Sequence, residues 1–295
     1  MPNKLPDAWV KAETVDLWPG RAPGFDEFKS KPLPDKSPAF FLRNTQTPHL
    51  HVFRPKTSNG RALLVIPGGA YEFVSISNEG VDVAERAGAL GYTVFVLNYR
   101  LPAEGWRRGP DVPLQDAQRA VRVIKAAAGR FRVDPDRIAV IGFSAGGHLA
   151  ASLATGFAEA VYDRVDVADQ RDAGPAATAL IYPVITMTTP FTHAGSRQNL
   201  LGSAPSDALV AARSPERHVG PATAPIFLAH AIDDTAVPVE NSLMMLGAAR
   251  AAKRPVEAHL FEEGGHAFGV GISGTPTSEW IPLLHLWLQR TFAAG

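Results

Sequence analysis

The stretch IGFSAGGHLA, residues 141–150, decides how this chain folds. The apolar run RIAVIGF (137–143) leads into it, and the small-residue run SAGGHLAASLAT (144–155) leads out of it. The first run has the pattern of a strand buried on both faces, and the second that of a closely packed helix. Ser144 therefore stands in a tight turn between a strand and a helix. Such a turn can present a serine hydroxyl as a nucleophile, although a simple glycine turn can carry the same residues.

Predicted strands and helices alternate along the rest of the chain. Six more apolar runs predict strands, at 50–55, 62–67, 92–99, 177–184, 224–231 and 255–262. Runs with helical spacing lie between and after them, at 81–91, 116–131, 241–253 and 278–292. This alternation predicts an α/β fold, with a mostly parallel twisted sheet and helices on both faces. In such a sheet, active residues lie in the loops that follow the carboxyl ends of the strands.

We predict one domain over residues 1–295, with two irregular parts. Residues 1–48 are rich in Pro, Lys and Asp but carry scattered Trp and Phe, which favour burial. We therefore expect an irregular N-terminal arm that wraps the domain. Residues 187–219 interrupt the alternation and are rich in Ser, Thr and Pro. They form either a short lid over a pocket or a plain connecting excursion, and we expect His193 within them to lie at the surface.

Composition excludes several classes of function. Lys plus Arg equals Asp plus Glu at 29 each, so nothing predicts a nucleic-acid partner. The absence of cysteine excludes disulfides, thiolate metal sites and cysteine nucleophiles. The histidines show no H-E-x-x-H spacing, and no Walker or dinucleotide-binding motif occurs, so we predict no metal and no cofactor.

The sequence leaves the compartment and the oligomeric state open. No apolar run reaches 18 residues, so no membrane-spanning helix is expected. The opening segment, MPNKLPDAWVKAE, lacks the apolar core of a signal peptide. The protein is therefore cytoplasmic, or it is periplasmic or secreted with a signal peptide outside this sequence.

Partners for Ser144 follow two later strands. A serine hydroxyl needs a base, normally a histidine oriented by a carboxylate. Asp233 and Asp234 come just after the strand at 224–231, and His266 comes just after the strand at 255–262. Taken singly, each has an ordinary interpretation as a turn-forming aspartate or a loop histidine. Their common position after strands, in the order Ser, Asp, His, predicts a catalytic triad with Ser144 as nucleophile and His266 as base.

Two backbone segments are candidates for an oxyanion hole. Ala145 directly follows the serine, and Gly69 and Ala70 lie in the loop IPGGAY after an early strand, so their N–H groups are the expected donors. Gly68 lets the backbone approach the substrate closely. Tyr71 either lines the pocket or packs under the loop. The alternative for the whole loop is an ordinary glycine turn.

Three other polar residues could also have a functional role. His148 lies four residues after Ser144, but we expect a buried, hydrogen-bonded histidine. Asp116 begins the helix at 116–131, where it would complement the helix dipole and pair with Arg100. Glu79 would brace the oxyanion loop.

Eight short motifs carry a family resemblance, namely LWPGRAPG (17–24), PGGAY (67–71), NEG (78–80), NYRLP (98–102), PLQDAQRA (113–120), GFSAGGHLAA (142–151), DDTAVPVENSL (233–243) and GGHAFG (264–269). Together they resemble the α/β-hydrolases of the BD-FAE type, the acetyl-xylan-esterase-like and feruloyl-esterase-like proteins that are sometimes labelled xylanases. The resemblance covers most of residues 15–290. It implies an α/β-hydrolase fold, with Ser144 as nucleophile, His266 as base and Asp234, rather than Asp233, as the acid. Ala70 departs from the commoner third glycine, and its extra methyl group narrows the expected acyl pocket.

The resemblance and the residues together predict a serine carboxylesterase. We expect it to remove small acyl groups, above all acetyl, from a plant polysaccharide or its oligosaccharides. Glycoside hydrolysis is not expected, because it usually needs two facing carboxylates. Two alternatives stay open: the same triad acting on other small esters or peptides, and an α/β-hydrolase fold that only binds a ligand.

Overall fold

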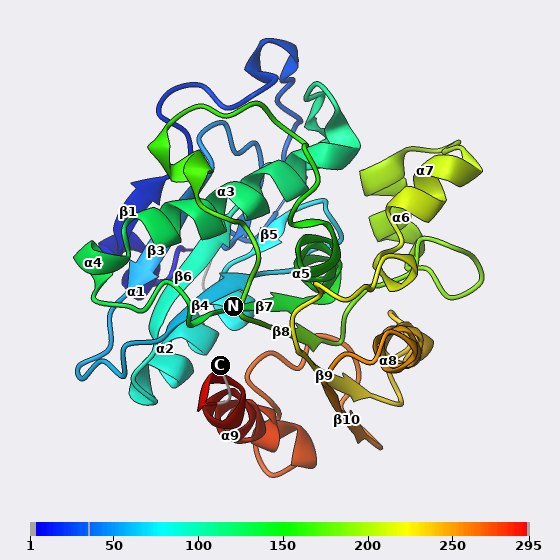
Figure 1. Ribbon diagram of the computed structural model, residues 1–295. Helices are drawn as coiled ribbons and strands as arrows, with labels where there is room; N and C mark the ends of the chain where they lie inside the picture. The colour runs from blue at the N-terminus through cyan, green and yellow to red at the C-terminus, as the bar shows by residue number, and fades with distance from the viewer. Residues whose placement is uncertain (1–3, 35, 294–295) are drawn as a thin grey trace.

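The computed structural model describes residues 4–34 and 36–293, and its centre is an eight-stranded sheet (Figure 1). The strands lie in the order β1 (Glu13–Asp16), β3 (His49–Phe53), β6 (Thr93–Asn98), β4 (Ala62–Ile66), β7 (Ile138–Phe143), β8 (Ala177–Ile181), β9 (Ile226–Ala231) and β10 (Val256–Phe261). The pairings β1–β3 and β3–β6 are antiparallel, and all the others in this sheet are parallel. The predicted mostly parallel sheet is confirmed.

Helices cover both faces of the sheet. The longer ones are α2 (Asp82–Ala89), α3 (Val112–Ala126), α5 (Ser144–Gly156), α8 (Glu240–Ala251) and α9 (Trp280–Ala293). In Figure 1, α3 and α5 lie on one side of the sheet, and α2 and α9 lie on the other. None of the helices described is long and apolar enough to cross a membrane.

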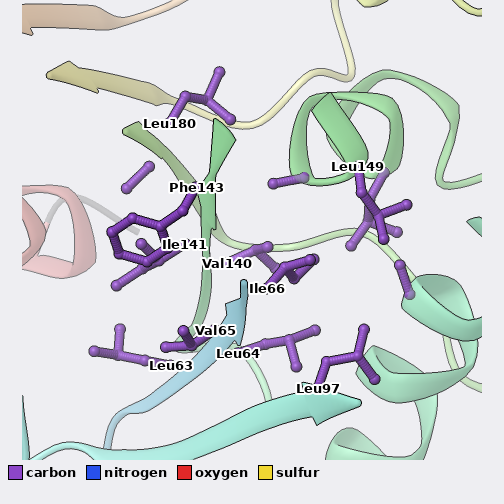
Figure 2. Close-up of a cluster of buried hydrophobic side chains, with 14 of the residues drawn as sticks. Leu63, Leu64, Val65, Ile66, Leu97, Val140, Ile141, Phe143, Leu149 and Leu180 are labelled. Carbon is purple, nitrogen blue, oxygen red and sulfur yellow. The ribbon is translucent and has the colours of Figure 1, made fainter. Parts of the chain in front are cut away.

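The central strands form the core because they are apolar on both faces. Every residue of β4, β6, β7, β8 and β9 is buried. Figure 2 shows Leu64 of β4 and Val140 of β7 on the side of the sheet where Leu97 of β6 and Leu149 of α5 pack, whereas Leu63 and Ile141 point to the other side. Two-sided burial is what a continuous apolar run predicts. The buried strands give the loops at their carboxyl ends a rigid base.

The N-terminal part is more regular than the sequence predicts. It holds the short helix α1 (Asp7–Lys11), the edge strand β1, and β2 (Phe41–Leu42), which pairs with β5 (Val74–Ser75) in a second small sheet. The arm therefore adds a strand to one edge of the main sheet. That strand was not predicted, because four residues that alternate half-buried and exposed give little signal.

Two further differences concern helix boundaries. The helix expected to begin at Asp116 begins at Val112 instead, because a proline is tolerated in the first helical turn. Asp116 is thus in the second turn, and the prediction that it complements the dipole at the helix N-terminus was wrong. The same predicted helix is divided, with α4 (Ala128–Phe131) as a separate final turn.

The segment 187–219 carries two short helices, α6 (Ala194–Leu201) and α7 (Asp207–Ala212). Asn199 of α6 donates a side-chain hydrogen bond to the carbonyl of Ala70, at 2.9 Å. The segment therefore borders the predicted oxyanion loop. That it acts as a lid stays a prediction.

Candidate active site

Ser144 is held in the strained turn that the sequence predicts. It follows the extended residue Phe143 at the end of β7 and is the first residue of α5, with a φ of 50°. This left-handed conformation is unfavourable for a residue with a side chain, so the surroundings must enforce it. Gly146 allows α5 to approach β4, since a Cβ there would lie 2.2 Å from the carbonyl oxygen of Ile66.

Ser144, His266 and Asp234 form one hydrogen-bonded chain. Ser144 Oγ lies 2.9 Å from His266 Nε2, and His266 Nδ1 lies 2.6 Å from Asp234 Oδ2. A carboxylate only accepts hydrogen bonds, so His266 carries its proton on Nδ1. Nε2 is then free to accept the proton of the serine hydroxyl.

Asp234 is fixed from two sides. Its Oδ1 accepts the backbone N–H groups of Ala236 and Val237, each at 2.9 Å, and its Oδ2 faces both His266 and His230. Burial alone would raise the pKa of Asp234, but the hydrogen bonds from His230, His266 and Val237 outweigh it and bring the pKa well below its ordinary value. Asp234 is therefore a carboxylate throughout the neutral range.

Asp233 has a different position. Its Oδ1 accepts the backbone N–H of Gly265 at 2.8 Å, which connects the loop after β9 to the loop that carries His266. The side chain is exposed, and the hydrogen bond of the His266 ring goes to Asp234 instead. The geometry thus separates two neighbouring aspartates that spacing alone does not distinguish.

Of the three residues predicted to form an oxyanion hole, Gly69 and Ala70 line the same cavity as Ser144, and Ala145 directly follows the serine. Ala145 lies in the first turn of α5, where N–H groups have no acceptor within the helix. Gly69 and Ala70 have φ values of 125° and 56°, and both line the same cavity as Ser144. A Cβ at Gly69 would lie 2.2 Å from the carbonyl oxygen of Phe73, so this turn requires glycine.

The cavity beside Ser144 and His266 has a volume of about 630 Å³. Its lining comes largely from the N-terminal arm and the oxyanion loop, and the apolar side chains are Leu5, Pro6, Phe40, Phe41 and Phe73. Phe41 stacks on Phe73 with ring centroids 4.0 Å apart. The polar lining includes Lys4, Ser75, Ser77, Asn78, Glu79 and His193. Within the described residues, no three His, Cys, Asp or Glu side chains are grouped to hold a metal ion.

Comparison with known proteins decides the family. The BD-FAE family model matches residues 50–248. The chain belongs to the BD-FAE family. An endo-1,4-beta-xylanase B from Butyrivibrio fibrisolvens is 36% identical over 208 residues, which cover 70% of this chain and 32% of that protein. An acetylxylan esterase from Xylanibacter ruminicola is 30% identical over 241 residues, which cover 80% of this chain and 47% of that protein.

A solved structure matches over nearly the whole length of this BD-FAE protein. The acetyl ester-xyloside bifunctional hydrolase from Caldicellulosiruptor lactoaceticus superposes with a TM-score of 0.81 at 33% identity, covering 95% of this chain and 96% of that one. This likeness confirms the α/β-hydrolase fold. The two curated relatives are longer, and the chain spans a third to a half of their length.

Two of the expected substrate contacts lie elsewhere in this family member. Tyr71 is 1% exposed, and its hydroxyl is 2.7 Å from His148 Nδ1 rather than in the cavity. With φ values of 56° at both Ala70 and Tyr71, the loop turns the tyrosine into the core. Gly68 donates its N–H to Glu79 Oε2 at 2.8 Å, and a Cβ there would lie 2.9 Å from Ser144 Cβ. Neither residue lines the cavity, so of the two alternatives for Tyr71 the geometry favours packing under the loop.

Several expected supporting roles are present in the geometry. His148 is buried and bonded at both ring nitrogens, to Tyr71 and to the carbonyl of Arg213. The fully buried Arg100 and Asp116 form an ion pair at 2.7 Å. His193 differs from its expected place at the surface, because it is half-buried and lines the cavity.

Glu79 and Tyr182 connect the two halves of the site. Glu79 Oε1 accepts the hydroxyl of Tyr182 at 2.9 Å, and that hydroxyl accepts the N–H of Gly269 at 3.1 Å. The Tyr182 ring also packs edge-on against the His266 ring, with centroids 5.1 Å apart. Burial raises the pKa of Glu79, although the hydrogen bonds from Gly68 and Tyr182 partly oppose this. One buried acid thus holds both the oxyanion loop and the histidine loop.

Sequence reasoning missed two members of this arrangement, Tyr182 and His230. Tyr182 follows β8 within a run that was predicted as a strand, and His230 lies inside β9. His230 is fully buried, with Nδ1 2.8 Å from Ser242 Oγ. The sequence did hold a signal for His230, because a histidine within an apolar strand needs a polar partner, and Asp234 follows four residues later.

Proposed function

We propose that this protein is a serine carboxylic ester hydrolase that removes acetyl groups from plant polysaccharide or its oligosaccharides. The observation that carries the proposal is the continuous hydrogen-bonded chain from Ser144 through His266 to Asp234, in which Ser144 and His266 line a cavity. The esterase names of the relatives support the ester bond, and the xylan-related names support the carbohydrate.

The first half of the reaction acylates the serine. His266 Nε2 takes the hydroxyl proton as Ser144 Oγ attacks the ester carbonyl carbon. The carbonyl oxygen becomes an oxyanion that the N–H groups of Gly69, Ala70 and Ala145 stabilise. The tetrahedral intermediate collapses, the bond to the sugar oxygen breaks, and His266 gives its proton to that oxygen. Asp234 stabilises the imidazolium while it exists.

The second half releases the acid. A water molecule gives a proton to His266 Nε2 and attacks the acyl carbonyl carbon through the same oxyanion hole. The bond to Ser144 Oγ then breaks, His266 returns the proton to the serine, and acetate leaves. No cofactor takes part in these steps.

The name of the solved neighbour includes xyloside hydrolysis, but we do not propose that activity for this protein. Glycoside hydrolysis usually needs two carboxyl groups that face the sugar. Glu79 supplies the only carboxyl group among the described residues that line the cavity, and both of its oxygens already accept hydrogen bonds.

Acetate release from acetylated xylan tests the proposal, with the parent protein and Ser144→Ala compared side by side. Release by the parent alone supports both the serine mechanism and the carbohydrate substrate. If neither protein releases acetate while the parent still cleaves p-nitrophenyl acetate, the serine hydrolase stands and the xylan substrate is wrong. Cleavage of p-nitrophenyl acetate by both proteins would refute the triad.

A further inference from the structure

Two histidines on β3 lie against each other, and neither belongs to the triad. His49 and His51 are two residues apart on a strand, so their side chains lie on the same face of the sheet. Their Nε2 atoms are 3.0 Å apart. His51 is 6% exposed, and His49 is half-buried.

Hydrogen bonds at the other ring nitrogens fix both tautomers. His49 Nδ1 donates to the carbonyl of Thr47 at 2.7 Å, and His51 Nδ1 donates to the carbonyl of Trp9 at 3.1 Å. A carbonyl oxygen cannot donate, so both Nδ1 atoms carry hydrogen. In neutral rings, both Nε2 atoms then present lone pairs to each other. Two lone pairs at this distance repel unless a cation lies between them.

The cation can be a proton or a metal ion, and the hydrogen bonds at the two Nδ1 atoms fit a metal-binding pair. Metal-binding histidines in proteins commonly donate their second ring N–H to a backbone carbonyl, as both of these do.

The geometry of the pair also indicates which metal. An ion about 2.0–2.1 Å from each Nε2 would make a nitrogen–metal–nitrogen angle of about 90–100° at the observed separation. This is the angle between neighbouring ligands in the square-planar or tetragonal sites of Cu²⁺ and Ni²⁺. A tetrahedral Zn²⁺ site would need the nitrogens about 3.3 Å apart. We propose that His49 and His51 form a two-histidine site for a tetragonal divalent transition metal, with Cu²⁺ bound more tightly than Zn²⁺.

Other ligands would come from water and from the neighbouring strand. Asp16 of β1 is paired directly with His49 in the antiparallel register, so its exposed side chain leaves the sheet on the same face. The described residues hold no ready-made group of three protein ligands, so water would complete the coordination.

The position of this pair connects it to the substrate cavity. The Trp9 ring stacks on the His51 ring, with centroids 3.4 Å apart, and Trp9 is the buried residue of α1. Lys4, Leu5 and Pro6, which directly precede α1, line the cavity beside Ser144. A metal ion on His51 would therefore hold α1 and, through it, one wall of the cavity. This last step rests on the proposed function, whereas metal binding itself does not.

Copper titration of the full-length protein tests the site, after treatment with EDTA and in a buffer that does not bind metals. We expect one Cu²⁺ per chain, an electron paramagnetic resonance spectrum with two nitrogen ligands, and quenching of Trp9 fluorescence. His49→Gln should weaken binding on the order of tenfold or more. His259→Gln is the matched control, because His259 is also a half-buried histidine on a strand, with its Nε2 3.0 Å from Glu257 Oε1. Its binding should equal that of the parent.

Three results would overturn the proposal: no saturable binding by the parent, equal binding by His49→Gln, or equal losses in both variants. The activity arm is separate. If copper binds as expected but KM for p-nitrophenyl acetate does not change, the site stands and its link to the cavity is wrong. If Ser144→Ala shows that the esterase proposal itself fails, the binding result is unaffected.

Discussion

Replacing Asp234 with asparagine should prevent His266 from acting as a base, although the new side chain has nearly the same size and shape. The asparagine has one oxygen and one amide nitrogen, and only the oxygen can accept hydrogen bonds. The backbone N–H groups of Ala236 and Val237, each 2.9 Å from Oδ1, select the oxygen for that position. The amide nitrogen then occupies the position of Oδ2, 2.6 Å from His266 Nδ1.

An amide donor there forces the opposite tautomer on His266. Nδ1 must accept, so the ring proton moves to Nε2, which can no longer take the proton of Ser144. Loss of the correct tautomer in a triad of this kind costs about 10⁴-fold in kcat, which corresponds to about 5.5 kcal/mol of transition-state stabilisation. We expect a loss of this order in kcat/KM, because the oxyanion hole is left intact.

Asp233→Asn is the matched control for this variant. Asp233 has the same side chain one residue away, but its described hydrogen bond is with the N–H of Gly265, and an asparagine oxygen can keep that bond. Initial rates on p-nitrophenyl acetate at pH 7.5 would be measured for both variants, with circular dichroism to verify folding. A kcat/KM of Asp234→Asn within tenfold of the parent, or an equal loss in Asp233→Asn, would refute the reasoning.

Three further predictions follow from buried polar groups. Glu79→Gln should lower kcat on p-nitrophenyl acetate by about 10–100-fold, because one of two buried donors loses its acceptor at a cost of about 1–3 kcal/mol; an unchanged kcat would contradict the bracing role. Asp116→Ala should reduce the free energy of unfolding in urea by about 3–5 kcal/mol, since it leaves Arg100 charged and fully buried; a loss below about 1 kcal/mol would show that the pair is not needed. The folded-state pKa of Asp234 lies below its ordinary value of 3.8, so its stabilisation is present above about pH 4 and is lost as the pH falls toward the folded pKa. Asp234→Asn should therefore unfold with a shallower pH dependence in this acid range, followed by circular dichroism, and an unchanged slope would be inconsistent with the lowered pKa.

The central sheet was predictable because two-sided burial leaves a strong pattern. Continuous apolar runs such as 62–66 and 138–143 have no other stable place in a soluble α/β protein. The turn at Ser144 follows from the same logic, because a strand and a helix meet there with glycines on both sides.

Other parts of the site depend on tertiary neighbours that a sequence does not display. The sequence left two places open for Tyr71, in the pocket or under the loop, and two successive left-handed residues turn it into the core. Tyr182 and His230 look like ordinary strand residues until the register places them against Glu79 and Asp234. A local pattern predicts which residues follow a strand, but not which way the following loop turns.

Labelling with a fluorophosphonate probe tests whether Ser144 is a nucleophile that His266 activates. The folded parent protein would be treated with the probe, digested and mapped by mass spectrometry, with His266→Ala treated in parallel. We expect one probe per chain, attached to Ser144, and labelling that is much slower in His266→Ala. Absence of labelling at Ser144 in the folded parent, or equal labelling rates in the two proteins, would contradict a serine nucleophile activated by His266.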